Sequence, residues 1–101
     1  MALTIRWTEG ALIDLKSTFE YLEVFWTERE LKNFSKVLEQ TLSIIIHHPL
    51  IFPVSAQKKH IHRAIVDANN VLYYRISRDK IEVLALFNPS QNPNRIVKNL
   101  K

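Results

Sequence analysis

Five side chains that could handle phosphate lie close together between Pro49 and Val66, a stretch without an acidic residue: Lys58, Lys59, His60, His62 and Arg63. Cleaving RNA through its 2′-hydroxyl needs a base, an acid and a positive charge at the phosphate. Arginine suits phosphate because its planar guanidinium donates two parallel hydrogen bonds. The candidate catalytic residues are therefore Arg63, Lys58, Lys59 and His62, and the alternative is that they are solvated charges on a loop and a strand edge.

The charge of the chain changes sign along its length. Residues 1–48 hold five Lys or Arg against seven Asp or Glu, a balance of −2, whereas residues 49–101 hold nine against three, a balance of +6. A basic segment attracts phosphate groups and acidic proteins through its summed field. We therefore expect the second half to bind a nucleic acid or an acidic partner.

Composition excludes several classes of site. The chain has no cysteine, so disulfides, thiolate metal sites and cysteine nucleophiles are excluded, and its single glycine excludes glycine-rich phosphate loops. His60 and His62 share one face of an expected strand and could hold zinc, but no third ligand accompanies them. We predict neither a metal nor a cofactor. No apolar run approaches the roughly 20 residues of a membrane helix, so we expect a cytoplasmic protein.

Two amphipathic helices are expected in the first half, after a short alternating strand over Leu3–Trp7. Thr8 has the type and position of an N-cap for the first helix, and Thr27 with Glu30 forms a capping box that begins the second. Pro49 ends the second helix. Apolar spacing predicts the buried stripes, which are Leu12, Leu15, Phe19, Leu22 and Trp26, then Leu31, Phe34, Leu38, Leu42 and Ile45.

Three strands are expected in the second half, after a loop over Pro49–Gln57 in which Phe52 and Val54 point inward. Alternation places Arg63 on one side with Ile61 and Ile65. The strands are predicted over His60–Val66, Val71–Ile76 and Ile81–Phe87, with turns at Asp67–Asn70 and Arg78–Asp79.

The order of elements predicts one α+β domain over residues 1–101. An N-terminal strand, whose place in the sheet the sequence does not determine, precedes an antiparallel helix hairpin. This hairpin packs on one face of an antiparallel β-meander. The opposite face is expected to stay open, so that Arg and Lys side chains reach a ligand there. Residues Asn94–Lys101 add a short basic helix or stay frayed.

Several segments carry a further signal through their order and spacing: Trp7–Leu15, Tyr21–Leu22, His48–Pro49, Phe52–Pro53, His62–Val66, Leu72–Ile76, Ile81–Phe87 and Gln91–Pro93. In that order they resemble the RelE/ParE superfamily of bacterial toxins, over almost the full length of the chain. The resemblance implies the same α+β fold and a toxin neutralised by a cognate antitoxin encoded beside it. Members similar to RelE cut mRNA in the ribosomal A site, whereas members similar to ParE act on DNA gyrase.

The resemblance also bears on single residues. Arg63 matches a family arginine on the first strand of the meander, and Lys58 and Lys59 lie where RelE-like members carry basic residues. One of the two tyrosines at 73 and 74 is expected to face the core and the other the open face. The candidate residues for binding a target or an antitoxin are Tyr74, Arg75, Ser90, Gln91, Asn92 and Arg95.

Two departures from the family pattern concern catalysis. Ser90 stands where one branch of the family has an arginine, and Arg95 is the substitute that the sequence offers. RelE-like nucleases also use a C-terminal tyrosine, but no tyrosine follows Tyr74 in this chain. Both gaps favour a ParE-like toxin over an mRNA endonuclease. The alternatives are a catalytically degenerate binding module of the same fold and a nucleic-acid-binding protein unrelated to toxins.

Overall fold

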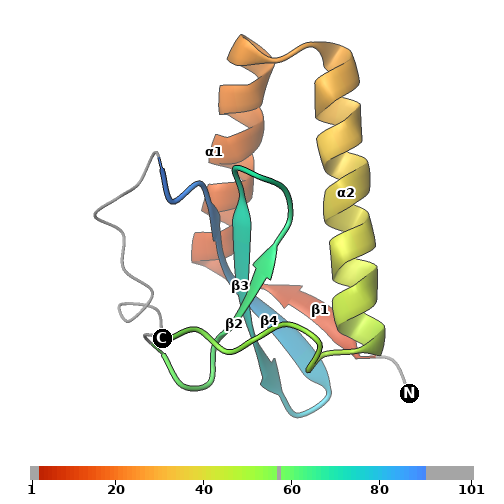
Figure 1. Ribbon diagram of the computed structural model, residues 1–101, viewed down its shortest axis with the longest axis vertical. Helices are drawn as coiled ribbons and strands as arrows, with labels where there is room; N and C mark the ends of the chain where they lie inside the picture. Colours follow the sequence, from red (N-terminus) through yellow and green to blue (C-terminus); the bar gives the residue numbers. More distant parts are fainter. Residues whose placement is uncertain (1–2, 57, 91–101) are drawn as a thin grey trace.

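The computed structural model describes residues 3–56 and 58–90, in which a strand, two helices and three strands follow one another (Figure 1). This is the predicted order. The predicted tail over Asn94–Lys101 lies outside the described residues. The elements are β1 (Thr4–Trp7), α1 (Glu9–Phe25), α2 (Glu28–His47), β2 (His62–Ile65), β3 (Val71–Ser77) and β4 (Lys80–Phe87).

Both helices begin at the predicted caps. The Thr8 hydroxyl accepts a hydrogen bond from the Ala11 amide at 3.2 Å and donates one to the Val83 carbonyl at 3.0 Å, so the cap also ties α1 to β4. Thr27 and Glu30 form the complete capping box at the start of α2. Within the described part of the chain, no helix is long and apolar enough to cross a membrane.

The four strands form one mixed sheet in the order β1–β4–β3–β2. The last three strands are the predicted antiparallel meander, and Arg78, with φ 58°, makes the two-residue turn between β3 and β4. The N-terminal strand, whose place the sequence left open, pairs in parallel with β4, with Ile5 opposite Ile81. The intervening helices and strands supply the long connection that a parallel pair needs.

The helices lie antiparallel to each other and cover the same face of the sheet (Figure 1). One predicted position on α1 is wrong: Leu12 is 51% exposed, whereas the neighbouring Ala11 is fully buried. The small Ala11 side chain allows close approach to the sheet, so the buried stripe of α1 begins at Ala11 instead of Leu12. The other predicted positions of the stripe pack on the core as predicted, namely Leu15, Phe19, Leu22 and Trp26. Buried members of this core include Ala11, Leu22, Phe34, Leu38, Ile45, Leu72, Tyr74, Ile81, Val83 and Leu86.

The outer edge of β2 is covered in part by the loop that precedes it. The Arg63 amide donates to the Pro53 carbonyl at 2.8 Å, and Val54 forms a bridge with His62. The strand runs over His62–Ile65, shorter than the predicted His60–Val66. Phe52 packs against the core as predicted, but Val54 is 47% exposed, because its backbone pairs with the strand edge while its side chain points to solvent.

Candidate binding surface on the outer face of the sheet

The face of the sheet away from the helices, here called the outer face, carries a row of charged residues across all four strands. Arg63 of β2 lies opposite Tyr73 of β3, and Arg75 of β3 lies opposite Glu82 of β4. Arg6 of β1 is the other neighbour of Glu82. Because opposed side chains on a sheet lie about 5 Å apart at Cβ, these residues form one connected surface.

Two arginines share one carboxylate at the centre of this row. Arg6 Nη1 lies 2.7 Å from Glu82 Oε2, and Arg75 Nε lies 2.8 Å from Glu82 Oε1. The hydrogen bond from Arg75, together with the positive charges of both arginines, lowers the pKa of Glu82 from its ordinary value against the opposing effect of burial. The three residues keep a net charge of +1 at neutral pH, and their guanidiniums have fixed directions.

The middle of the outer face is apolar and buried, so the prediction of an open face is wrong there. Tyr73 and Phe87 stack with their ring centroids 5.3 Å apart and an interplanar angle of 21°. They belong to a second buried cluster, separate from the main core, which is made up of Ile61, Val71, Tyr73, Leu84, Ala85 and Phe87. Strands that are apolar on both sides bury both sides, and β3 and β4 are of this kind.

His62 lies in the core and not beside Arg63, which corrects the prediction that both are catalytic. Its ring stacks on Tyr74 at a centroid distance of 5.0 Å, and its Nδ1 lies 2.9 Å from the Phe52 carbonyl. A carbonyl only accepts, so Nδ1 carries the proton. Consecutive residues on a strand point to opposite faces, so His62 and Arg63 cannot reach one phosphate from the same side.

Tyr74 is likewise a core residue, so its assignment to the binding surface is corrected. It is fully buried, and its hydroxyl donates to the Pro49 carbonyl at 2.6 Å. Burial raises its pKa to about 12. Of the two neighbouring tyrosines, Tyr73 is the one on the outer face.

The remaining basic residues lie at the start of β2. Lys58, Lys59 and His60 are exposed in a turn that the Ile61 amide closes by donating to the Lys58 carbonyl at 3.2 Å. Their exposure suits contact with a partner. His60 lies in this turn, whereas His62 lies on β2, so the two histidines do not share one face of a strand. Among the described residues, no group of three potential metal ligands occurs.

Ser90 follows β4 in an exposed turn, where its amide donates to the Asn88 side-chain oxygen at 2.9 Å. Gln91, Asn92 and Arg95 lie outside the described residues. Sequence reasoning missed Arg6 and Glu82, which the parallel pairing of β1 with β4 brings together. Their signal was present as charges of opposite sign, each between two apolar neighbours on its strand, but pairing them required the strand order.

A sequence model described as the ParE toxin of the type II toxin–antitoxin system parDE matches residues 5–93. The chain belongs to the ParE toxin family. It is thus a toxin of a type II toxin–antitoxin system, which confirms the resemblance predicted from its motifs. No protein with a curated description matches this ParE-family toxin in sequence.

Solved structures of toxins share the fold. The chromosomal ParDE system of P. aeruginosa superposes with a TM-score of 0.72 at 10% identity, covering 86% of this chain and 96% of the other. The RelBE2 complex of Mycobacterium tuberculosis gives 0.62 at 20% identity, covering 87% and 99%. The DinJ–YafQ complex of E. coli gives 0.62 at 12% identity, covering 90% and 97%. The ParE-family toxin therefore has a fold that occurs in several toxin systems, and its target must be argued from its own surface.

Proposed function

We propose that this toxin stops growth by binding DNA gyrase and that a cognate antitoxin neutralises it by covering the outer face and the basic turn. The separation of Arg63 from His62 carries the first part of the proposal. RNA cleavage by the 2′-hydroxyl needs a base within hydrogen-bond reach of that hydroxyl, while the arginine holds the neighbouring phosphate. With His62 bonded inside the core, the surface keeps positive charge for binding and lacks that imidazole for proton transfer.

The charge of the surface supports an acidic antitoxin as the partner. Arg63, Lys58 and Lys59 lie in the basic half of the chain, and the described part of that half also includes Arg75 on the outer face and Arg78 in the turn between β3 and β4. Complementary charge speeds association and excludes wrong partners. ParDE, RelBE2 and DinJ–YafQ are toxin–antitoxin systems, which supports a hetero-oligomer of toxin and antitoxin in the cytoplasm.

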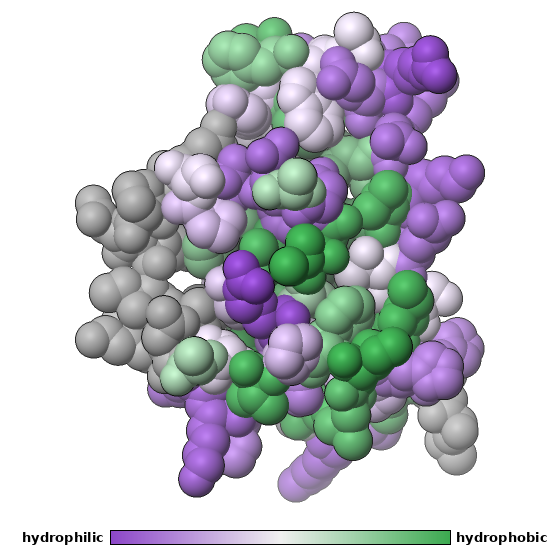
Figure 2. Space-filling view, in the orientation of Figure 1, coloured by the Kyte–Doolittle hydropathy of each residue, from purple (hydrophilic) through white to green (hydrophobic). Residues whose placement is uncertain are grey.

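Exposed apolar side chains support a protein target. Figure 2 shows hydrophobic side chains gathered over the lower middle of the view, where the loop after α2 crosses, with polar side chains along α2. In that loop Leu50 is 75% exposed and Ile51 is 61% exposed. Ile65, on the same face as Arg63, is 58% exposed. Protein interfaces combine such apolar anchors with a charged rim, whereas a phosphate site needs no apolar anchor.

Induced expression tests the proposal. Cells producing the toxin alone should stop growing, co-expression of the small reading frame beside its gene should restore growth, and primer extension on translated mRNA should show no A-site cuts. The matched control is Lys36→Ala, which removes an exposed cation from α2 and should leave the arrest intact. Normal growth during expression of the folded toxin would contradict the proposal.

A second candidate is a ribosome-dependent mRNA endonuclease. The structural likeness to the RelBE2 and DinJ–YafQ complexes favours it, together with an arginine on β2 and two exposed lysines in the turn before that strand. The same primer extension decides the matter, because A-site cuts that appear on induction and vanish in Arg63→Ala would assign the toxin to this class. If induction of the toxin causes neither growth arrest nor mRNA cuts, the remaining candidate is a binding module of the same fold.

A further inference from the structure

β2 is the end strand of the sheet, so one of its edges has no partner strand among the described residues (Figure 1). The loop before β2 covers only the beginning of this edge. There Val54 forms a bridge with His62, and the Arg63 amide donates to a carbonyl of the loop at 2.8 Å. The edge beyond Arg63 has no backbone partner in the described part of the chain. An uncovered edge of this kind presents amide and carbonyl groups to another chain.

Ile65 lies at the centre of the uncovered edge. The Val66 amide donates to the Asn70 carbonyl at 3.0 Å, so residues 66 and 70 form a hydrogen-bonded pair. Such pairs alternate along two antiparallel strands, so the amide and the carbonyl of Ile65 point away from β3. Within residues 3–56 and 58–90, nothing forms a hydrogen bond with either group. Because its side chain is 58% exposed, Ile65 offers a donor, an acceptor and an apolar contact at one place.

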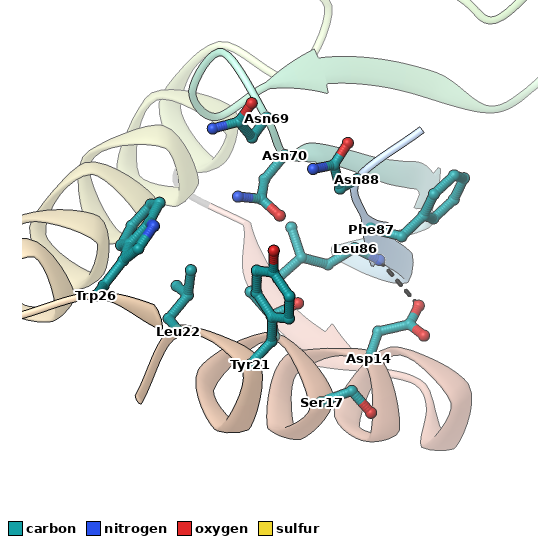
Figure 3. A pocket seen from close by; sticks show the side chains of 11 residues that line it. Asp14, Ser17, Tyr21, Leu22, Trp26, Asn69, Asn70, Leu86, Phe87 and Asn88 are labelled. Carbon is teal, nitrogen blue, oxygen red and sulfur yellow. Dashed lines mark hydrogen bonds between the residues drawn. The ribbon is translucent and has the colours of Figure 1, made fainter. Parts of the chain in front are cut away.

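Two charges of opposite sign flank Ile65. Arg63 lies two residues before it and Asp67 two residues after it, and both are partly exposed. Neither forms an ion pair with another described residue. Asp67 Oδ1 accepts the amide hydrogens of Asn69 and Asn70, both at 2.8 Å. These two asparagines also line a pocket of about 330 Å³ between their turn, α1 and the end of β4 (Figure 3). The turn therefore gives Asp67 a defined position beside the edge.

We propose that the uncovered edge of β2 pairs with the same edge of a second copy of this toxin. A two-fold axis at Ile65 makes the two strands antiparallel, and each Ile65 amide donates to the Ile65 carbonyl of the other copy. The same register places Arg63 opposite Asp67 of the second copy, and the symmetry repeats this ion pair. The edge is thus complementary to itself in hydrogen bonds, apolar contact and charge, which favours a second copy over other occupants.

This dimer goes beyond the proposed binding of gyrase and antitoxin by the outer face. It places Arg63 in an interface between two toxins, so self-association competes with any other partner that Arg63 binds. Because only a short stretch of each strand pairs, the contact belongs to the small class of protein interfaces. We therefore expect a weak dimer with a dissociation constant in the micromolar range.

Sedimentation velocity of the purified toxin alone tests the proposal, so its result is separate from that of any gyrase assay. The wild type should change from monomer to dimer as its concentration rises through the micromolar range. Ile65→Lys should stay monomeric, because it places two like charges opposite each other at the axis. Val24→Lys, which alters a 75% exposed apolar residue on α1, is the matched control and should dimerise normally. A monomer at all concentrations, or a dimer that Ile65→Lys leaves intact, would overturn the proposal.

A double-mutant cycle with Arg63→Gln and Asp67→Asn tests the register. Within one chain the two residues are four positions apart, about 13 Å along an extended strand, which is too far for direct contact. Asp67→Asn keeps an oxygen that can accept the two amides of its turn. Each single variant should weaken dimerisation about fivefold, and the double variant no further, because both changes remove the same ion pairs between copies. Losses that multiply in the folded double variant would overturn the proposed pairing.

Hydrogen exchange of the Ile65 amide identifies what occupies the edge. We expect protection that increases with toxin concentration, because the second copy accepts this hydrogen. Protection that is the same at all concentrations would show that the toxin's own chain covers the edge. Protection that appears only when the antitoxin is added would show that a strand of the antitoxin covers it. Either of the last two results would overturn the proposal.

Discussion

Glu82 receives a hydrogen bond from Arg75 at 2.8 Å while its second carboxylate oxygen lies 2.7 Å from Arg6. One carboxylate on β4 thus orients two guanidiniums from the strands on either side. The arginine side chains are 56% exposed at Arg6 and 40% exposed at Arg75, so solvent screens both pairs. We therefore attribute to Glu82 a modest effect on stability and a larger one on the direction of the arginines.

Replacing Glu82 by glutamine should lower the free energy of unfolding by about 1 kcal/mol, because two partly exposed ion pairs are lost. Urea unfolding at low salt measures this loss. The difference from wild type should shrink as salt rises, since exposed charges are screened. A loss that is independent of salt would show that packing, and not charge, is responsible.

The contribution of Glu82 should also depend on pH. Its pKa is lowered in the folded state, so the stabilisation is fully present above the ordinary glutamate pKa of about 4.3 and is lost as pH falls through the lower folded value. The stability gap between wild type and Glu82→Gln should therefore be constant near neutral pH and close in acid. Urea unfolding across this range checks it, and a gap that widens in acid would contradict the sign.

Tyr74→Phe separates a structural role from a catalytic one. The change leaves the Pro49 carbonyl without its donor and should lower the free energy of unfolding by about 1–2 kcal/mol. Growth arrest at a temperature where the variant is folded should persist, because the hydroxyl lies inside the core. Thermal unfolding and a growth curve measure the two effects, and loss of arrest in a fully folded variant would argue for a direct role.

Local features of this fold were predictable from neighbouring residues alone. Thr8 and Thr27 begin their helices because a hydroxyl can satisfy free amides within three residues, and Arg78–Asp79 forms its turn within a hairpin. The position of β1 was not predictable in this way. Its partner, β4, lies more than 70 residues away, and two apolar strands carry no local sign of which edge they share.

The candidate site shows the same limit. Alternation correctly put Arg63 on the side opposite His62, and applying it fully would have removed His62 from the catalytic set. It could not say which of Tyr73 and Tyr74 faces the helices, because β3 is apolar at successive positions and its first four residues are buried. The pocket between α1, the turn before β3 and the end of β4 had no sequence signal, since it depends on how these elements lie against one another.

Arg63→Ala should remove the growth arrest while changing the free energy of unfolding little, within about 0.5 kcal/mol, because the side chain lies partly exposed on the outer face. Affinity for the antitoxin should fall, and it should depend less steeply on salt. Isothermal titration at two salt concentrations measures both quantities. Full arrest by Arg63→Ala would show that the outer face near β2 is not the working surface.

Supercoiling by purified DNA gyrase tests the central claim most directly. Addition of the purified toxin should inhibit supercoiling, the cognate antitoxin should relieve the inhibition, and Arg63→Ala should inhibit much less than Lys36→Ala at the same concentration. Unimpaired supercoiling with a folded toxin that still arrests growth in cells would contradict the claim.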